Sequence, residues 1–220
     1  MHFADRAEAG RRLARELQHF AGERPVVLGL ARGGLPVGYE IALALRAPLD
    51  AVLVRKIGVP WQRELALGAI VDGETPDQVI DQGLVDMLSI PRAYVEEEIA
   101  RQSQEIKRRR RLYTKGRLRV EVKGKTAIVV DDGIATGASM QVTLGAIRRR
   151  QPKRLVLAVP VAAPDSLAML RPLADETICL HSPTDLGAIS LFYDDFHNVE
   201  DEEVISLLDR AEKAAAPPPA

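Results

Sequence analysis

The chain has 220 residues, is 46% hydrophobic and 4% aromatic, and carries a formal net charge of −1. This length suits one globular domain, and the near-zero charge provides no overall attraction to nucleic acid or membrane surfaces. No apolar run approaches the roughly 20 residues that cross a bilayer, and no signal peptide is recognisable. The single cysteine cannot form an internal disulfide, so we expect a cytoplasmic protein that binds neither nucleic acid nor membrane.

The N-terminal part of the chain predicts two helices separated by a strand. Asp5 is placed to cap the first helix. The strand covers residues 26–30, and apolar positions at helical spacing over residues 37–45 predict the second helix. Between them Gly33 and Gly34 allow backbone conformations closed to other residues, but the glycine spacing is not that of a dinucleotide-binding loop. An ordinary glycine-containing turn is the alternative to a binding loop.

A third strand is predicted over residues 50–54, and it ends at Arg55 and Lys56. The following stretch, residues 57–74, alternates poorly between polar and apolar types and contains Gly58, Pro60 and the only tryptophan. Its charged residues can be ligands or simply solvated.

A long helix is predicted from Arg92 to about Tyr113. Acidic residues lie near its start and the run KRRRR, residues 107–111, near its end, which matches the helix dipole. The run could contact nucleic acid, but no aromatic residues are interleaved with it. A solvated helix end is therefore expected, with an oligomer contact as the next option.

The most informative stretch is TAIVVDDGIATGASMQ, residues 126–141. Its apolar start predicts a buried strand that ends at Asp131 and Asp132, and a turn of small residues leads into a helix from about Ser139. Strand, acidic pair, turn and helix in this order predict an anion site at the carboxyl end of a strand. A hairpin at Asp132 is disfavoured because a helical period follows, and the lysine of a Walker A loop is missing.

Residues 135–139 have the side chains that a phosphate-binding turn requires. Ala135, Gly137 and Ala138 are small enough for backbone N–H groups to surround an anion, and the following helix adds a favourable dipole. Thr136 and Ser139 can donate hydroxyl hydrogen bonds. The two preceding carboxylates would repel a bare phosphate, so they are better suited to hydroxyls or a hydrated divalent cation.

Further strands are predicted over residues 154–160 and 176–180, with a helix capped by Asp165 between them. Strands that alternate with helices predict an α/β fold with a doubly wound, mainly parallel sheet flanked by helices. We expect one domain over residues 1–210 and a disordered Ala/Pro tail over residues 211–220.

The motif VVDDGIATGAS resembles the phosphoribosyl pyrophosphate signature of type I phosphoribosyltransferases, although Gly133 stands where a larger residue is more usual. Together with ARGGLPVG, VRKIGVP, ELALGAI and FYDDF, it looks most like predicted bacterial phosphoribosyltransferases without an assigned acceptor. The resemblance covers most of residues 26–204.

This resemblance implies roles for particular residues. The acidic pair would hold the ribose hydroxyls, and the turn that follows would hold the 5′-phosphate: Asp131 and Asp132 for the first, and Ala135, Thr136, Gly137, Ala138 and Ser139 for the second. Pyrophosphate would be bound by Arg32, Gly33, Gly34, Arg55 and Lys56. Magnesium would be held through the substrate, with Asp131 and Asp132 as possible contributors.

The resemblance also implies a mobile loop after the third strand, in which Lys56 or Glu64 would handle the proton of the reaction. A small hood from about residues 1–22 and 181–210 would cover the base, with Phe192 and Tyr193 as its contacts. A homo-oligomer, most simply a dimer, is expected.

The expected function is magnesium-dependent transfer of a phosphoribosyl group to a nitrogenous base, or the reverse. Ala135 stands where enzymes acting on hypoxanthine or guanine usually carry an acid, so those acceptors are disfavoured. Two alternatives remain open at this point. One is a sensor that binds phosphoribosyl pyrophosphate or a nucleotide without turnover, and the other is a phosphatase or phosphorylase acting on a ribose phosphate.

Overall fold

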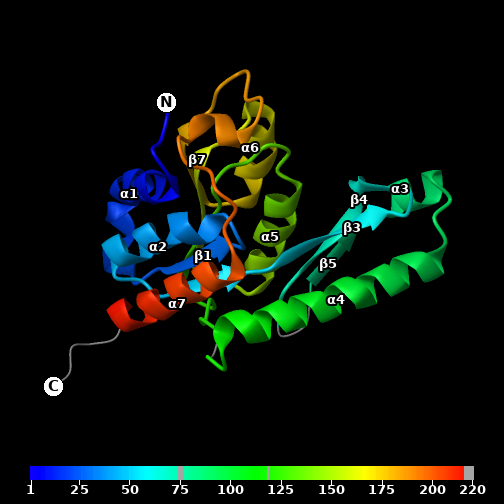
Figure 1. Cartoon of the computed structure of the whole chain (residues 1–220), viewed down its shortest axis with the longest axis horizontal. Helices are drawn as coiled ribbons and strands as arrows, with labels where there is room; N and C mark the ends of the chain where they lie inside the picture. The colour runs from blue at the N-terminus through cyan, green and yellow to red at the C-terminus, as the bar shows by residue number, and fades with distance from the viewer. Residues whose placement is uncertain (74–76, 118, 216–220) are drawn as a thin grey trace.

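The computed structural model describes residues 1–73, 77–117 and 119–215, without the side chains of Arg63 and Glu64. It has two parts, a body built around a five-stranded sheet and an arm that extends from it (Figure 1). The arm consists of a three-stranded sheet and two helices, the longer of which connects back to the body.

The body contains five parallel strands in the order β2-β1-β6-β7-β8. These are β1 (Val26–Leu30), β2 (Leu49–Val52), β6 (Thr126–Val130), β7 (Arg154–Val161) and β8 (Glu176–His181). Its α-helices are α1 (Arg6–Glu16), α2 (Gly34–Leu45), α5 (Ala138–Arg149), α6 (Pro164–Leu170) and α7 (Asp201–Ala215), and short 3₁₀ helices cover Gln18–Glu23, Arg171–Leu173 and Ile189–Phe192. The predicted fold class is confirmed.

Both faces of this sheet are covered, which explains why its strands are apolar throughout. In β6, Ile128 and Val130 pack in one cluster with residues of α1, α2 and α7. Ala127 and Val129 point to the opposite face and pack with residues of α5 and α6. Alternating side chains of a strand point to opposite faces, so a sheet buried on both sides requires apolar residues at every position.

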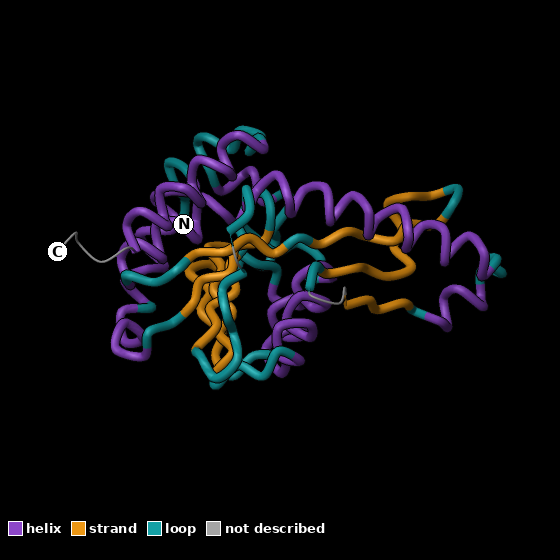
Figure 2. The backbone as a smooth tube through the Cα atoms, turned by 90° about the horizontal axis from the view of Figure 1, so that it is seen from below, coloured by secondary structure: helices purple, strands orange, loops and turns teal. Residues whose placement is uncertain are grey.

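The arm includes most of the residues 57–74 that were predicted as a loop, and Glu74 lies outside the described residues. Its strands β3 (Val54–Val59), β4 (Gln62–Val71) and β5 (Asp77–Ile80) form an antiparallel sheet. The loop prediction was wrong because the β3–β4 pairing shifts register on both sides of Gly58, which interrupts the two-residue alternation. Helices α3 (Gln82–Met87) and α4 (Arg92–Thr114) complete the arm, and α4 runs along the three strands (Figure 2).

Arg110 fastens α4 to the body. Its two terminal nitrogens donate to the carboxylate oxygens of Asp50 in β2, each at 2.8 Å. Asp72, which follows β4, approaches the Nε of Arg110 at 3.3 Å and also pairs with Arg119 at 3.1 Å. The expectation that the whole run 107–111 is solvated was therefore wrong for Arg110, which is 8% exposed.

The two chain ends take different positions. Phe3 pairs with Tyr193, and its N–H donates to the carbonyl of Phe192, so the N-terminal segment lies beside the late segment. In contrast, α7 packs against α2 and α4. Residues 211–215, predicted to be part of a disordered tail, belong to this helix, because Leu207, Leu208 and Ala211 continue its buried stripe. Asp165 lies in the first turn of α6, which Ala163 caps.

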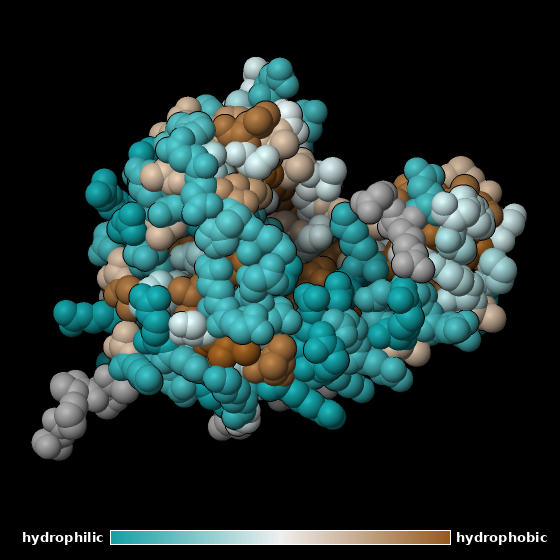
Figure 3. Space-filling view, viewed as in Figure 1, coloured by the Kyte–Doolittle hydropathy of each residue, from teal (hydrophilic) through white to brown (hydrophobic). Residues whose placement is uncertain are grey.

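The surface seen in Figure 3 is mostly hydrophilic, and its apolar patches are small. Within the described residues, no helix combines the length and the apolar character needed to cross a membrane.

Candidate functional site

Asp131 and Asp132, the acidic pair in the turn after β6, lie against the glycine loop, residues 31–34 after β1, although the two were predicted separately. Both follow neighbouring parallel strands, β6 and β1, and therefore meet at the same edge of the sheet. A Cβ added to Gly33 would lie 2.1 Å from Asp132 Oδ2, and one added to Gly34 would lie 2.6 Å from the carbonyl oxygen of Val130. The two glycines are therefore required by close approach to the acidic turn.

The glycine loop begins with a cis peptide bond between Ala31 and Arg32. The Arg32 side chain is bound to residues just before α7. It donates to Asn198 at 3.2 Å and to Glu200 at 3.1 Å. Arg32 nevertheless lines the same cavity as Asp132, so these contacts would have to be exchanged for a bound anion.

Asp131 and Asp132 form a closely coupled acidic pair. Burial raises the pKa of the Asp131 carboxyl well above its usual value, and the adjacent charge of Asp132 raises it further. Burial also raises the pKa of Asp132, but Arg6 opposes this effect. The backbone N–H of Asp132 donates to Asp131 Oδ1 at 2.9 Å, which holds one carboxylate next to the other.

Arg6 is the main site residue that the sequence did not reveal. Its Nε donates to Asp132 Oδ2 at 2.8 Å, and its Nη1 donates to the carbonyl of His197, also at 2.8 Å. The guanidinium lies 3.8 Å from the centre of the Phe196 ring. No motif marks Arg6, because it is one of many arginines and its partners lie at the far end of the chain.

A cavity of 370 Å³ opens beside the acidic pair, lined by Arg6, Arg32, Gly33, Asp132, Ile189, Phe196, Asn198 and Val199. Ile189, which lines this cavity, packs directly against Gly133, where an added Cβ would lie 2.4 Å from the Ile189 side chain. Gly133 therefore stands where a larger residue is more usual because Ile189 occupies the space that a side chain would need.

The expected base contacts are placed differently from the prediction. Tyr193 is 5% exposed, and its ring lies 5.4 Å from that of Phe3 and 5.0 Å from that of Phe196. Its hydroxyl donates to the carbonyl of Asp132 at 2.6 Å, so Tyr193 supports the acidic turn and cannot offer its ring to a base. Phe192 lies edge-on to His181 and does not line the cavity. Phe196 lines it instead.

The turn at residues 135–139 has the predicted form. Gly137 has φ of +76° and precedes the first turn of α5, where a Cβ would lie 2.9 Å from Met169. The carbonyl of Ala135 accepts a hydrogen bond from Ser166 at 2.5 Å, which ties the turn to α6. Among the described residues, the hydroxyls of Thr136 and Ser139 make no hydrogen bond to the protein. Free hydroxyls and helix N–H groups at one place suit a phosphate.

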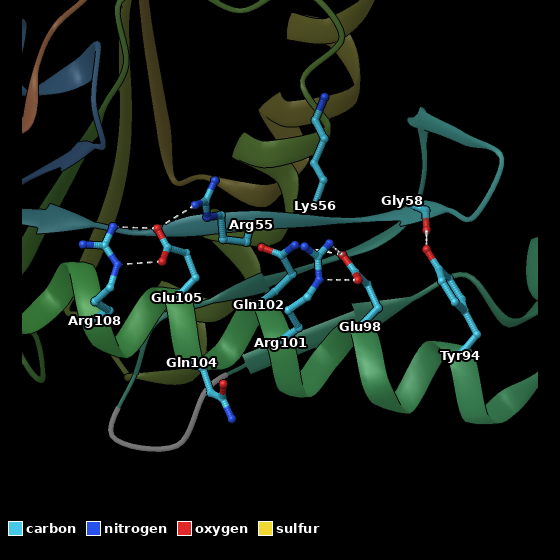
Figure 4. A pocket seen from close by; sticks show the side chains of 10 residues that line it. All are labelled: Arg55, Lys56, Gly58, Tyr94, Glu98, Arg101, Gln102, Gln104, Glu105 and Arg108. Carbon is cyan, nitrogen blue, oxygen red and sulfur yellow. Dashed lines mark hydrogen bonds and ion pairs between the residues drawn. The ribbon is translucent and has the colours of Figure 1, made fainter.

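Arg55 and Lys56 are consecutive residues of β3, so their side chains leave the strand on opposite faces. Figure 4 shows Lys56 pointing away from α4 and Arg55 paired with Glu105. Arg55 donates to Glu105 of α4 at 3.0 Å. Both residues line a second cavity, of 710 Å³, between β3 and α4, separate from the acidic pair. Arg55 would have to leave Glu105 before it could bind a pyrophosphate.

The sequence also predicted a role for Glu64 and the binding of magnesium. The side chain of Glu64, a candidate proton-handling group, lies outside the described part of the structure. For magnesium, no cluster of three or more His, Cys, Asp or Glu side chains is present among the described residues. Since magnesium commonly binds through one or two carboxylates together with substrate phosphates, the donor set of Asp131 and Asp132 fits an ion that arrives with its substrate.

Comparisons with known proteins agree with this geometry. A family model described as "Phosphoribosyl transferase domain" matches residues 78–196, more than half of the chain. "Putative phosphoribosyl transferase Rv0571c" and "Putative phosphoribosyl transferase MT0597", from two strains of Mycobacterium tuberculosis, are each 41% identical over 226 aligned positions, which cover 99% of this chain and 51% of theirs. The chain thus spans about half the length of these curated relatives. The crystal structure of TT1426 from Thermus thermophilus is 41% identical with a TM-score of 0.81, covering 94% of this chain and 98% of that one.

Proposed function

The chain belongs to the phosphoribosyl transferase domain family, and we propose that it transfers the 5-phosphoribosyl group from phosphoribosyl pyrophosphate to a nitrogenous base, or catalyses the reverse reaction. One observation carries the proposal. The glycine loop after β1 touches the acidic pair after β6, so a phosphate-binding backbone and a pair of hydroxyl acceptors lie side by side.

In the proposed reaction the bond from ribose C1′ to the pyrophosphate oxygen breaks, and pyrophosphate leaves with the electron pair. A new bond forms from C1′ to a nitrogen of the base, which loses a proton. Positive charge develops on the ribose between these events. Asp131 and Asp132 are suited to accept hydrogen bonds from the ribose hydroxyls, and in their ionised form their field would stabilise this charge. The raised pKa of Asp131 opposes that form, whereas Arg6 favours it at Asp132.

The other groups have complementary roles. The turn at residues 135–139 offers the N-terminus of α5 to the 5′-phosphate. The backbone of Gly33 and Gly34 is available to the pyrophosphate next to the acidic pair. Magnesium, bound with the substrate, would supply positive charge to the leaving group. Lys56, on the face of β3 turned away from α4, is the arm residue best suited to meet pyrophosphate or to handle the proton.

The cavity lined by Phe196 and Ile189 is the proposed place of the base. Its apolar walls suit a planar ring, and Ala135 supplies no acid for the ring nitrogen of hypoxanthine or guanine. We therefore propose an adenine-like or orotate-like acceptor, or an uncommon base. A homodimer and a cytoplasmic location stay predictions, the first of which light scattering would test.

The test is calorimetric titration of phosphoribosyl pyrophosphate with magnesium, followed by a pyrophosphate-release assay over a panel of nucleobases. We expect saturable binding and base-dependent release of pyrophosphate. The double variant Asp131→Asn/Asp132→Asn should keep its circular dichroism spectrum and lose turnover. Binding without any release would instead indicate a sensor, and phosphate release without a base would indicate a phosphatase. Unchanged turnover in the double variant would refute the assignment of the site.

A further inference from the structure

Arg6 connects three segments that are distant in the sequence. It is the first residue of α1, yet its side chain is only 8% exposed. Its two hydrogen bonds, to Asp132 and to the carbonyl of His197, lie in the guanidinium plane, while the Phe196 ring covers a face of that plane. Two in-plane bonds and a stacked ring leave the guanidinium little rotational freedom.

Asp132 is in turn held from several directions. Arg6 donates to Oδ2, Tyr193 donates to the backbone carbonyl, and Gly33 packs against the carboxylate. Asp132 Oδ1 and Asp131 Oδ2 accept no hydrogen bond from a basic side chain among the residues that the structure describes. The contacts therefore fix Oδ2 of Asp132, whereas no cation holds Oδ1 among the described residues.

We propose that Arg6 is a positioning residue for phosphoribosyl transfer, which orients the Asp132 carboxylate so that its Oδ1 meets the ribose hydroxyls. The inference rests on the proposed function. Arg6 also lines the cavity proposed for the base, but the inferred effect is exerted through Asp132. Without Arg6, the carboxylate keeps its packing against Gly33 and its contact with the Asp131 carboxyl but loses the cation that holds Oδ2, and it can rotate out of line with the ribose.

The first test compares Arg6→Ala with Arg11→Ala in the pyrophosphate-release assay. Arg11 lies on the same helix, but it is 54% exposed and reaches Glu40 at 3.7 Å, so it is the matched control. Loss of orientation at a reacting centre costs up to about 100-fold in rate. We expect kcat of Arg6→Ala to fall at least about tenfold, while KM for phosphoribosyl pyrophosphate changes less than about threefold because phosphate contacts dominate ground-state binding.

Two further variants separate positioning from folding. Arg6→Lys keeps the charge but cannot reproduce the planar fork, so we expect partial recovery of kcat. Arg6→Gln keeps one donor without the charge and serves if Arg6→Ala does not fold. Calorimetric binding of phosphoribosyl pyrophosphate, which needs no turnover, should stay within about threefold of wild type for each folded variant, because these variants leave the phosphate contacts intact.

A double-mutant cycle decides whether Arg6 acts through Asp132. In the Asp132→Asn background, Arg6→Ala should reduce the residual kcat by less than about threefold, because the group that Arg6 orients is already altered. If Arg6→Ala reduced kcat by the same factor in the wild-type and Asp132→Asn backgrounds, the inference would be overturned. A wild-type kcat in the Arg6→Ala variant would also overturn it. If the wild-type protein neither binds nor turns over phosphoribosyl pyrophosphate, the proposed function itself has failed, which is a distinguishable result.

Discussion

The α-carbon of Gly33 faces the carboxylate of Asp132 so closely that a methyl group at Gly33 would overlap it, with 2.1 Å between the added Cβ and Oδ2. The Asp132 carboxylate cannot easily move aside, because Arg6 donates a hydrogen bond to the same oxygen, Oδ2. The glycine loop and the acidic turn therefore form one unit, and a change in either displaces the other.

Gly33→Ala is expected to damage activity more than stability. The overlap forces Asp132 or the loop to move, which costs about 1–3 kcal/mol in a packed site and displaces the carboxylate proposed to act in catalysis. We expect loss of turnover with a modest fall in the unfolding midpoint in urea. Gly22→Ala is the control, since a Cβ there has no neighbour within 4 Å. Equal activity of the two variants would contradict the assigned contact.

Substitution of Lys56 should mainly affect turnover, whereas substitution of the adjacent Arg55 should mainly affect stability. Lys56 is exposed on the face of β3 away from α4, so Lys56→Ala should slow turnover more than it weakens substrate binding. Arg55 is paired with Glu105, so Arg55→Ala should loosen α4 from β3 and lower thermal stability. Steady-state kinetics and thermal unfolding of both variants check this. A larger KM alone in Lys56→Ala would make Lys56 a binding residue.

Arg110→Ala should be strongly destabilising. It leaves Asp50 without its bidentate partner and removes one of the two cations beside Asp72, whose side chain is 2% exposed. Removing one member of a buried ion pair typically costs about 3–5 kcal/mol. The adjacent Arg111→Ala is the control, because Arg111 is exposed and should change the free energy of unfolding by less than about 0.5 kcal/mol. Urea denaturation that showed the same small change for both would disprove the anchoring role.

The stability of the arm should depend on acid through Glu105. Hydrogen bonding to Arg108 is the main reason why the pKa of Glu105 falls from 4.5 to about 2, and Arg109 and Arg55 contribute. A carboxyl with a lower pKa in the folded state stabilises the fold above its unfolded pKa. That contribution is lost as the pH falls from 4.5 through about 2.

We therefore expect Glu105→Gln to be less stable than wild type at pH values above this window and the difference to shrink within it. Urea midpoints measured from neutral pH down to the acid range test this, with Glu97→Gln, an exposed position of α4, as control. A constant difference across the range would show that the ion pairs of Glu105 do not stabilise the arm.

Residues 57–74 were predicted as a loop, but most of them belong to strands β3 and β4. Strand β6 was predictable because both sheet faces bury it, which makes all its residues apolar. The arm strands lack such a pattern, since the register shifts at Gly58 disturb the alternation. Arg110 was misjudged for a related reason. In a run of five cations the sequence alone does not distinguish the one that turns inward toward Asp50.

By itself, the sequence determined the parallel sheet, the acidic pair at the end of β6 and the glycines after β1, because these depend on local periodicity and on residues with special backbone or charge properties. Only the tertiary structure decided that Arg6 meets Asp132, that Tyr193 supports the acidic turn through its hydroxyl, and that Arg55 and Lys56 face apart. These contacts join residues far apart in the chain or depend on strand pairing. They are set by how helices and strands pack, which no short motif encodes.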